Sequence, residues 1–427
     1  MRASSALLIA SVLFACASND AVTPLAKDGG VDSSITDASA PDAADTAPAM
    51  HYPAFIPAMG QLVDHKGGTL ANPKFVTVTW SSDANEGFFQ AFTDAIGSSE
   101  YWKATTSEYG VGPAVSGGHV SIKTPPPATI QQSDLENWLS QQVSNAPGNG
   151  WPANDASTVY VLYLPESLKL AAGGHPTCDS AGGYHTSTTA NGNELVYAII
   201  DTECHPQWGY PVSTYASFVG SHELVEVVTD PHVSTQAGFV GFDDAHAAWS
   251  PFVLYYEENG DSCRFNADSV VSFTSPPYFM QRSWSNASAK AGHNPCSPNP
   301  DPYFNVTPLD MVDITIRDRD VFGGIKKKLT KGYPMQVGVQ ASIDFGFYSD
   351  QPLPKWSVQA IEGSPFAFNT PSPTLTLALQ TKSGQDGDIG TLYITPNYAS
   401  PPAGTLVTIV SLGTAKHFMP FLIMVTK

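Results

Sequence analysis

The stretch "STYASFVGSHELVEVVTDPH", residues 213–232, predicts one long helix that ends at a turn. Apolar residues recur at 215, 218, 219, 224, 225, 227 and 228, and no proline interrupts them. Pro231 disfavours helical conformation in the residue before it. We therefore expect a helix from about 213 to 229, packed against a sheet formed by the preceding part of the chain.

This helix carries His-Glu-x-x-Glu, which is the His-Glu-x-x-His pattern of zinc proteases with a glutamate in place of the second histidine. His222 and Glu226 are four residues apart and would share one helix face. An imidazole nitrogen and a carboxylate oxygen are both good zinc ligands. Glu223 would lie about 100° round the helix, where zinc proteases hold the carboxylate that takes a proton from water. The pattern predicts His222 and Glu226 as ligands and Glu223 as general base.

His232 is one candidate for the third ligand. It lies ten residues after His222, which is the distance between the first and last ligands of the metzincin pattern. Metzincins have a glycine in the intervening turn, whereas this chain has Thr229-Asp230-Pro231. The spacing favours His232 and the turn chemistry does not.

Asp261, in "ENGDSC" (258–263), is the rival third ligand, and His185 and His246 are further alternatives. Carboxylate oxygens also suit calcium. Glu258 and Asp261 would therefore serve equally in a structural calcium site.

The segment before the helix has alternating and apolar runs that predict an α+β domain. Strands are expected at 74–80, 119–123, 158–165 and 194–201, and helices at 87–102 and 133–146. The Gly-rich stretch 173–193 is expected to be a loop. This order predicts a zincin-like domain over 51–298, with a mixed sheet behind the helix that carries the site.

The pattern of apolar and polar residues changes after about residue 298. A Pro/Asn-rich linker at 299–308 precedes seven or so short alternating runs, separated by turns and without helical periodicity. This pattern predicts that 299–427 is an all-β sandwich of the immunoglobulin-like type.

The N-terminus has the features of an export signal. Arg2 precedes an apolar stretch, and "LFAC" (13–16) is similar to a bacterial lipobox with Cys16 as the lipidated residue. Residues 17–50 contain six Asp, one Lys and few large side chains, so we expect a disordered acidic tether. The chain is therefore expected outside the cytoplasm, anchored to the membrane through Cys16 or secreted.

Export determines how the cysteines are interpreted. Five are present, and removing Cys16 leaves Cys178, Cys204, Cys263 and Cys296. Four cysteines in an oxidising compartment suggest two disulfides, with three alternative pairings. Pairing 178 with 204 and 263 with 296 is favoured because each pair brackets one loop.

The charge excludes one class of partner. The chain has a net charge of -19, which argues against nucleic-acid binding because phosphate contacts need a basic face. An acidic surface also keeps an exported protein soluble.

Residues about 70–298 resemble the phosphate-induced, Exordium-like family and its exported bacterial relatives. The resemblance rests on "SEYWKATTSEYGVG" (99–112), "CDSAGGYH" (178–185), "SHELVEVVTDP" (221–231), "ENGDSC" (258–263) and "QRSWSN" (281–286). It implies an extracytoplasmic domain similar to zincin-type metallopeptidases, with a glutamate in place of the second histidine.

Two functions follow from these patterns. The first is a zinc-dependent hydrolase, most naturally a metallopeptidase acting on a peptide or protein substrate. The alternative is a non-catalytic, surface-tethered binding or adhesion protein, with a structural metal or none. Composition and spacing do not predict the oligomeric state.

Overall fold

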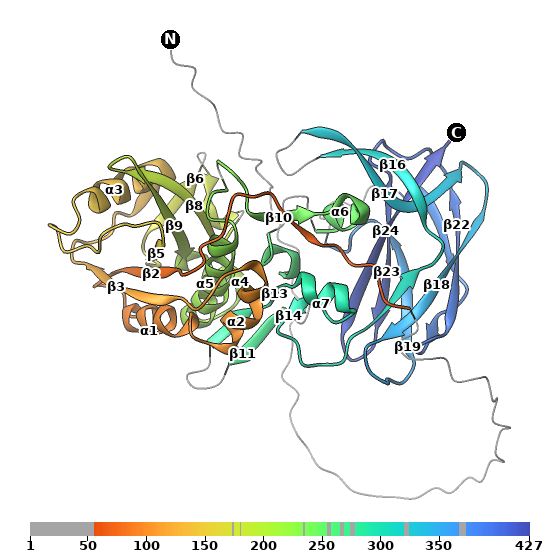
Figure 1. Ribbon diagram of the computed structural model, residues 1–427, viewed down its shortest axis with the longest axis horizontal. Coiled ribbons are helices and arrows are strands. Elements are labelled where there is room, and N and C mark those ends of the chain that lie inside the picture. Colours follow the sequence, from red (N-terminus) through yellow and green to blue (C-terminus); the bar gives the residue numbers. More distant parts are fainter. Residues whose placement is uncertain are drawn as a thin grey trace, which may run out of the picture.

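The computed structural model describes residues 55–172, 175–179, 181–233, 235–253, 258–264, 269–273, 278–319, 324–366 and 373–427. The expected signal peptide, Cys16 anchor and acidic tether lie outside these residues. The described chain forms two lobes, an N-terminal mixed α+β lobe and a C-terminal all-β lobe (Figure 1). Within the described ranges, no helix combines the length and apolar composition needed to cross a membrane.

A five-stranded sheet forms the centre of the first lobe. Its order is β3-β2-β5-β9-β8. The bounds are Val115–Ile122 for β3, Lys74–Trp80 for β2, Thr158–Leu164 for β5, Asn193–Asp201 for β9 and Gly183–Ala190 for β8. The first four strands are parallel and β8 is antiparallel to β9. Every residue of β5 is buried, as expected for a parallel strand covered on both faces.

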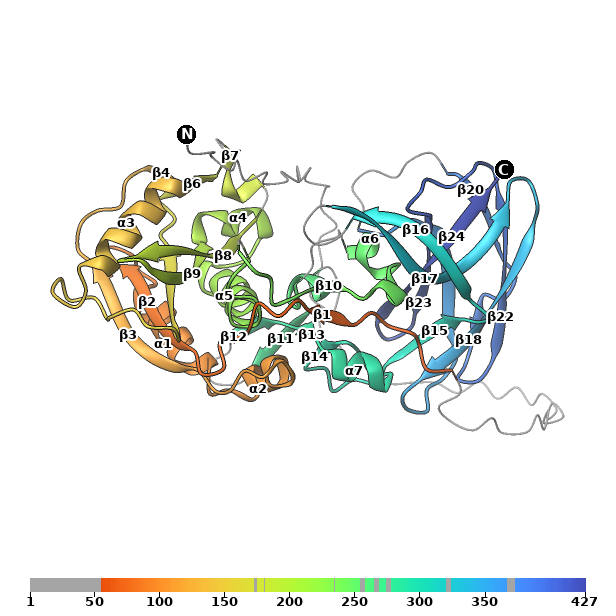
Figure 2. The same ribbon diagram turned by 45° about the horizontal axis from the view of Figure 1, so that its top comes forward.

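Helices cover both faces of this sheet (Figure 2). One face packs on α3 (Gln132–Ser144) through Leu135, Leu139 and Val143. The other packs on α1 (Glu86–Ile96), α2 (Glu100–Thr106) and the long α5 (Val212–Thr229). The single helix expected at 87–102 is therefore two, and the Ser99 side chain caps the second by accepting from the Trp102 N–H.

The long helix α5 is buried on nearly all sides. It has the sheet on one side and the hairpin of β11 (Val270–Phe273) and β12 (Tyr278–Gln281) on another. The Gln281 N–H donates to the Ser221 hydroxyl at 2.8 Å, which fixes β12 against the helix. Because both sides are covered, α5 has apolar residues on every side and lacks the single apolar face of an amphipathic helix.

Shorter elements complete the first lobe and its junction with the second. The strands are β1 (Leu62–Asp64), β4 (Thr129–Gln131), β6 (Lys169–Ala172), β7 (His175–Pro176), β10 (Phe239–Phe242), β13 (Ser283–Trp284) and β14 (Cys296–Ser297). The helices are α4 (His205–Trp208), α6 (Trp249–Val253) and α7 (Asn286–Ala291). The single 3-10 turns are η1 (Ser107–Tyr109), η2 (Thr177–Asp179), η3 (Thr202–Cys204), η4 (Asp244–His246) and η5 (Asp261–Cys263).

Two disulfides are present, and both have the expected pairing. Cys178 pairs with Cys204 and Cys263 pairs with Cys296. The first joins η2 to η3 in the first lobe. The second ties η5 to β14 at the base of the lobe, next to Trp284. Two disulfides are compatible with a protein outside the cytoplasm.

The second lobe is a sandwich of two sheets. One has the order β15-β18-β22-β20 and the other β16-β17-β24-β23-β19-β21. The first sheet comprises Phe304–Pro308, Ala341–Ser349, Ile389–Pro396 and Leu375–Leu379 in that order. The second comprises Val312–Arg319, Ile325–Gln336, Lys416–Thr426, Thr405–Leu412, Trp356–Glu362 and Ser383–Gly384. The segment expected to be a linker therefore includes the first strand, β15.

Candidate metal centre

The helix α5 brings His222 and Glu226 together, as their spacing predicts. His222 Nε2 lies 3.1 Å from Glu226 Oε2. Both side chains leave the same face of the helix, and only 13% and 3% of them are exposed. The pair is thus preformed and largely shielded from water.

Asp261 reaches the same point from η5. Its Oδ1 is 3.7 Å from His222 Nε2, and its backbone N–H donates to Glu226 Oε1 at 2.9 Å. Arg264 donates to the same Asp261 oxygen at 2.6 Å and fixes the carboxylate. The donor atoms of His222, Glu226 and Asp261 all lie within 4.8 Å of one another.

A glycine makes this approach of η5 feasible. A Cβ on Gly260 would lie 2.8 Å from Glu226 Oε1 and 2.9 Å from His222 Nδ1, both closer than van der Waals contact. The Gln281 side chain donates to the Gly260 carbonyl at 2.7 Å and holds this backbone in place. The sequence "ENGDSC" therefore delivers Asp261 because a residue without a side chain precedes it.

These donors fit zinc. Zinc sits about 2.0–2.2 Å from imidazole nitrogen and carboxylate oxygen, which places neighbouring ligand atoms roughly 3.3–3.5 Å apart in a tetrahedral site. The 3.1 Å and 3.7 Å separations in this group need only small adjustments. One departure is His222 Nδ1, which makes no hydrogen bond to a described residue, whereas ligating imidazoles usually have such a partner.

A second histidine, His185, completes a larger buried cluster. It lies on β8, and its Nδ1 is 3.3 Å from Glu223 Oε2 and 3.9 Å from Glu226 Oε2. Its Nε2 is 3.2 Å from both the Asp230 carbonyl oxygen and Glu258 Oε1. The sequence expectation named His185 only as an alternative, because the stretch that carries it was expected to be a loop.

The carboxylates dominate the electrostatics of the cluster. Burial alone would lower the pKa of His222, but the carboxylates of Glu226, Glu223 and Asp261 together outweigh this effect and raise that pKa to about 10. Burial also acts to lower the pKa of His185, and the carboxylates of Glu258 and Glu223 raise it well above its usual value. With no cation bound, both imidazoles are therefore held as imidazolium at neutral pH.

A cavity of about 110 Å³ opens onto the cluster. His222 and Glu223 lie in its wall, beside the apolar side chains of Trp208, Phe218 and Val219. The remaining lining residues are Ala181, Gly182, Gly183, Arg264 and Gln281. A molecule in this cavity would contact the His222 imidazole and the Glu223 carboxylate at one end and an apolar surface at the other.

His232 does not join the cluster, which corrects the expectation drawn from its spacing. Its Nδ1 lies 2.9 Å from Glu194 Oε1, and the side chain is partly exposed. The reason is the turn after α5. Asp230 Oδ1 accepts the Gly238 N–H at 2.7 Å and directs the chain toward β10 rather than back under the helix.

His246 also lies outside the cluster, whereas both carboxylates of the expected calcium pair lie within it. His246 Nδ1 is 2.9 Å from both carboxylate oxygens of Asp243 in η4, outside the cluster. Glu258 lies next to His185 and Asp261 next to His222. The two carboxylates that would have formed an oxygen-only calcium site therefore approach different imidazoles.

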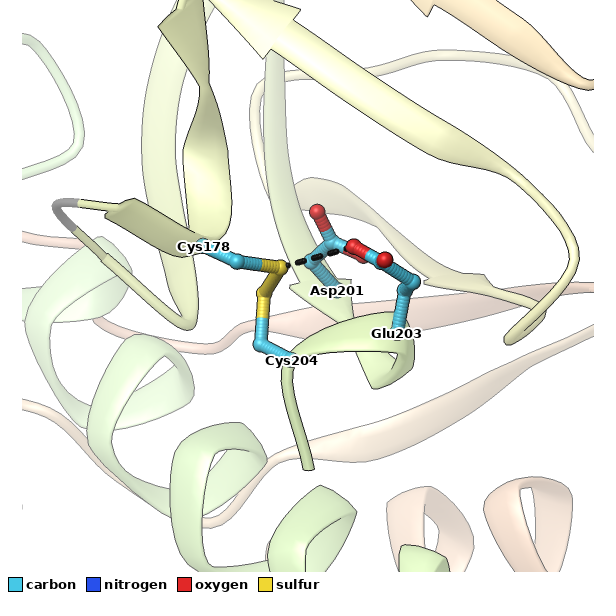
Figure 3. A group of neighbouring side chains, drawn as sticks. All are labelled: Cys178, Asp201, Glu203 and Cys204. Atoms are coloured by element: carbon cyan, nitrogen blue, oxygen red, sulfur yellow. Dashed lines mark hydrogen bonds between the residues drawn. A yellow bond between two sulfur atoms is a disulfide. The ribbon is translucent and has the colours of Figure 1, made fainter. Parts of the chain in front are cut away.

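A further group of cysteines and carboxylates surrounds the first disulfide (Figure 3). Cys178 Sγ lies 3.0 Å from Glu203 Oε2, and Asp201 is beside them. Both sulfur atoms are bonded to each other and carry no thiolate, so this group lacks the donors of a cysteine metal site. It is a disulfide with acidic neighbours.

Comparisons with known proteins do not assign the chain to a family. No family model matches it, and no curated protein matches it. Similar solved structures include a chimeric titin Z1Z2 carrying a KLER peptide from decorin, at 14% identity over 22% of this chain and 86% of that one, with a TM-score of 0.15. A complex of titin M10 with an obscurin-like 1 Ig domain matches at 13% identity, 29% and 96% coverage and a TM-score of 0.15.

One solved structure matches over a longer part of this chain. It is a nucleoside hydrolase-related hypothetical protein from Saccharophagus degradans, associated with carbohydrate metabolism. The match has 11% identity, covers 71% of this chain and 72% of that one, and has a TM-score of 0.18. At such TM-scores none of these structures assigns a fold or an activity to this chain.

Proposed function

We propose that the chain is an exported zinc-dependent hydrolase, and that its substrates are peptides or proteins. The observation that carries this proposal is the group of His222, Glu226 and Asp261 at the end of a cavity whose wall also holds Glu223. Of the third ligands left open by the sequence, Asp261 is the one favoured by its 3.7 Å distance to His222 Nε2. The zincin-like character of the domain is part of this proposal.

Zinc held there would supply Lewis acidity toward a water molecule and toward the scissile carbonyl. Glu223 Oε1 lies 4.0 Å from His222 Nε2, on the cavity side. From this position Glu223 would accept a proton from the attacking water and deliver it to the leaving amine. Trp208, Phe218 and Val219 would exclude bulk water and bind an apolar part of the substrate.

The second carboxylate ligand has a chemical consequence. Two carboxylates and one imidazole neutralise a divalent cation more fully than two or three neutral imidazoles do. The metal would therefore polarise water less strongly, and turnover would be slower than that of a three-histidine or two-histidine site. Arg264, which donates to Asp261, partly offsets this effect.

The lipid anchor on Cys16 and the immunoglobulin-like character of the sandwich belong to the same proposal. An anchored chain would present the α+β lobe on the outer side of a membrane. The two disulfides support an oxidising location of this kind.

A second candidate is a binding protein without catalysis. It is favoured by the pairing within the cluster, because His222 meets Glu226, His185 meets Glu223, and Arg264 meets Asp261. Such a network could be a self-contained buried ion-pair group. The sandwich would then serve adhesion, and the metal would be structural or absent.

Cleavage, measured together with metal content, separates these candidates, because a structural metal would be retained without cleavage. Wild-type protein and His222→Ala are purified without chelator, and zinc is measured by elemental analysis alongside cleavage of a mixed peptide library. We expect zinc and cleavage in wild type, and loss of cleavage together with weakened zinc binding in His222→Ala. Wild type that retains no zinc when zinc is supplied, or wild type loaded with one equivalent of zinc that cleaves no peptide at any pH, would contradict the hydrolase proposal.

A further inference from the structure

The buried cluster contains two overlapping groups of ligand-type atoms. One is His222, Glu226 and Asp261, and the other is His185, Glu223 and Glu226. In each, the donor atoms lie within 4.8 Å of one another, and Glu226 belongs to both. The proposed function uses only the first group and leaves His185 without a role.

The geometry of the second group is as suitable for a cation as that of the first. His185 Nδ1 is 3.3 Å from Glu223 Oε2 and 3.9 Å from Glu226 Oε2. A cation bound at about 2.0–2.2 Å from each atom needs ligand separations of roughly 3.3–3.5 Å. The three side chains are 3%, 5% and 3% exposed, so the group is closed to bulk water.

The far side of the His185 ring is held as that of a ligating imidazole usually is. Its Nε2 lies 3.2 Å from the Asp230 carbonyl oxygen, to which it can donate while Nδ1 faces the two carboxylates. A carbonyl partner of this kind fixes the orientation of a metal-binding imidazole. Glu258 Oε1 is 3.2 Å from the same nitrogen, so a further largely buried carboxylate oxygen lies beside the group.

The charge of the cluster also favours more than one cation. Four carboxylates converge here, those of Glu223, Glu226, Glu258 and Asp261. Arg264 pairs with the last of them, Asp261. Buried carboxylates are costly unless they are paired or coordinate metal. With one divalent ion at the first group, the carboxylates of Glu223 and Glu258 still lie beside His185.

We propose that a second divalent cation, of the zinc type, binds His185, Glu223 and Glu226, and that it inhibits the hydrolase. The inhibition rests on the proposed function, in which Glu223 must be free to accept a proton. A cation on the Glu223 carboxylate engages the electron pair that would take this proton. The first cation therefore activates the protein and the second switches it off.

The test begins with binding, which needs no activity. Wild type is stripped with chelator, and zinc is titrated by calorimetry, with metal content measured after desalting. We expect two equivalents in wild type and one tight equivalent in His185→Asn, because loss of the ligand weakens the second site by at least roughly 10- to 100-fold. His232→Asn is the matched control, since His232 pairs with Glu194 away from the cluster, and it should still bind two.

Cleavage is then measured during the same titration. The readout is the ratio of the rate at two equivalents of zinc to the rate at one, which cancels differences in basal rate between variants. We expect this ratio to be well below one in wild type and near one in His185→Asn. His185→Gln replaces His185→Asn if circular dichroism shows that the latter is unfolded.

The outcomes distinguish this inference from the proposed function. Binding of a single equivalent by wild type overturns the second site and leaves the hydrolase proposal standing. If wild type binds two equivalents of zinc and the cleavage rate rises up to the second equivalent, the proposed inhibition is overturned. No cleavage at any zinc level contradicts the hydrolase and the inhibition together, while the stoichiometry of wild type and His185→Asn still decides whether the second site exists.

Discussion

Glu223 and Glu226 lie three residues apart, yet the structure gives them different chemical positions. Glu223 is in the cavity wall, whereas Glu226 is not among the residues that line the cavity and accepts the Asp261 N–H. A proton acceptor must reach the substrate, and a ligand must face the cation. The two glutamates therefore separate the roles of base and ligand on one helix.

Substitution of each glutamate tests these roles. Glu223→Gln keeps the shape of the side chain but loses the base, so with one equivalent of zinc we expect metal to stay bound and turnover to fall by about two to four orders of magnitude. Glu226→Gln removes a charged ligand, so zinc affinity should fall together with activity. The measurements are zinc dissociation constants and single-peptide turnover.

Glu194→Gln serves as the control for this pair, because Glu194 is a surface glutamate bonded to His232. Glu194→Gln should change neither the zinc dissociation constant nor the turnover. Turnover that survives in Glu223→Gln would exclude Glu223 as the base. Unchanged zinc affinity in Glu226→Gln would exclude Glu226 as a ligand.

Asp201, at the end of β9, has an unfavourable buried charge. Burial raises its pKa to about 6, although the Thr177 hydroxyl donates to its Oδ2 at 2.5 Å. Its other oxygen, Oδ1, has no hydrogen-bond partner in the described part of the chain. The folded protein therefore holds the Asp201 proton up to a higher pH than the unfolded chain does.

This shift predicts a pH dependence of stability. Because the raised pKa belongs to the folded state, the contribution of Asp201 to the free energy of unfolding falls as pH rises from about 4 to about 6, by at most about 3 kcal/mol. Asp201→Asn cannot titrate, so the stability of wild type relative to this variant should fall over that range. Urea unfolding at pH 4, 5, 6 and 7 measures the difference.

Asp134→Asn, at an exposed position on α3, controls for the loss of one negative charge. Its profile should stay parallel to that of wild type. A wild-type profile that is also parallel to that of Asp201→Asn would show that this carboxyl does not hold a proton in the folded state.

At the scale of elements, the edge strand β8 and the turn η5 supply what the helix α5 lacks. The helix carries three of the functional side chains, and these elements add His185 and Asp261. The turn η5 is short and is anchored by the Cys263–Cys296 disulfide and by Gln281. The position of Asp261 therefore depends on a covalent bond to a segment 33 residues further along the chain.

The two disulfides form a matched pair for testing this dependence. Serine in place of both Cys263 and Cys296, or of both Cys178 and Cys204, should lower stability by roughly 2–5 kcal/mol in either case. Only loss of the 263–296 bridge should also weaken zinc binding, by about tenfold or more, because it frees the segment that holds Asp261. Thermal unfolding and zinc titration of the two double variants measure both effects.

Equal zinc affinity in the two double variants would contradict the role of the second bridge in the site. If only the 178–204 variant binds zinc more weakly, the metal site depends on the first disulfide and not on the second. Metal-free unfolding scans separate the loss of chain constraint from the loss of bound metal.

At the scale of the whole molecule, the hydrophobic cluster of the sandwich extends into the junction with the first lobe. Phe242, Trp249 and Trp284, at the junction, form ring contacts with centroid separations of 4.9, 5.3 and 6.1 Å. These residues belong to the same cluster as the sandwich residues Phe347 and Trp356. The lobes are therefore coupled by packing, and not only by the connecting chain (Figure 1).

Trp284 is the residue with which to test this coupling. It is 1% exposed, its indole donates to the Gly60 carbonyl at 3.2 Å, and its own carbonyl accepts the Tyr109 hydroxyl at 2.6 Å. Trp284→Ala should destabilise the protein by about 3–5 kcal/mol. Calorimetry should show both lobes unfolding together at a lower temperature, whereas two separate transitions, with only one shifted, would show independent lobes.

The sequence by itself determined the helix around His222 and the approach of Glu226, because residues four apart share a face whatever the fold around them. It also predicted the mixed α+β class, four strands of the central sheet and both disulfide pairings. The strand β8 was missed because Gly, Ser and Thr dominate it, although Asn191-Gly192 is a strong hairpin signal. The φ values of Asn191 and Gly192, 51° and 77°, suit a tight two-residue turn between β8 and β9.

Only the tertiary structure decided which distant residues join the helix. His232 has the right spacing along the chain, but a hydrogen bond from Gly238 to Asp230 directs it away. Asp261 and His185 have no spacing rule that links them to His222, and a disulfide, a glycine and an edge strand bring them there. Local periodicity fixes neighbours on one element, whereas contacts between elements depend on packing that no short stretch of sequence contains.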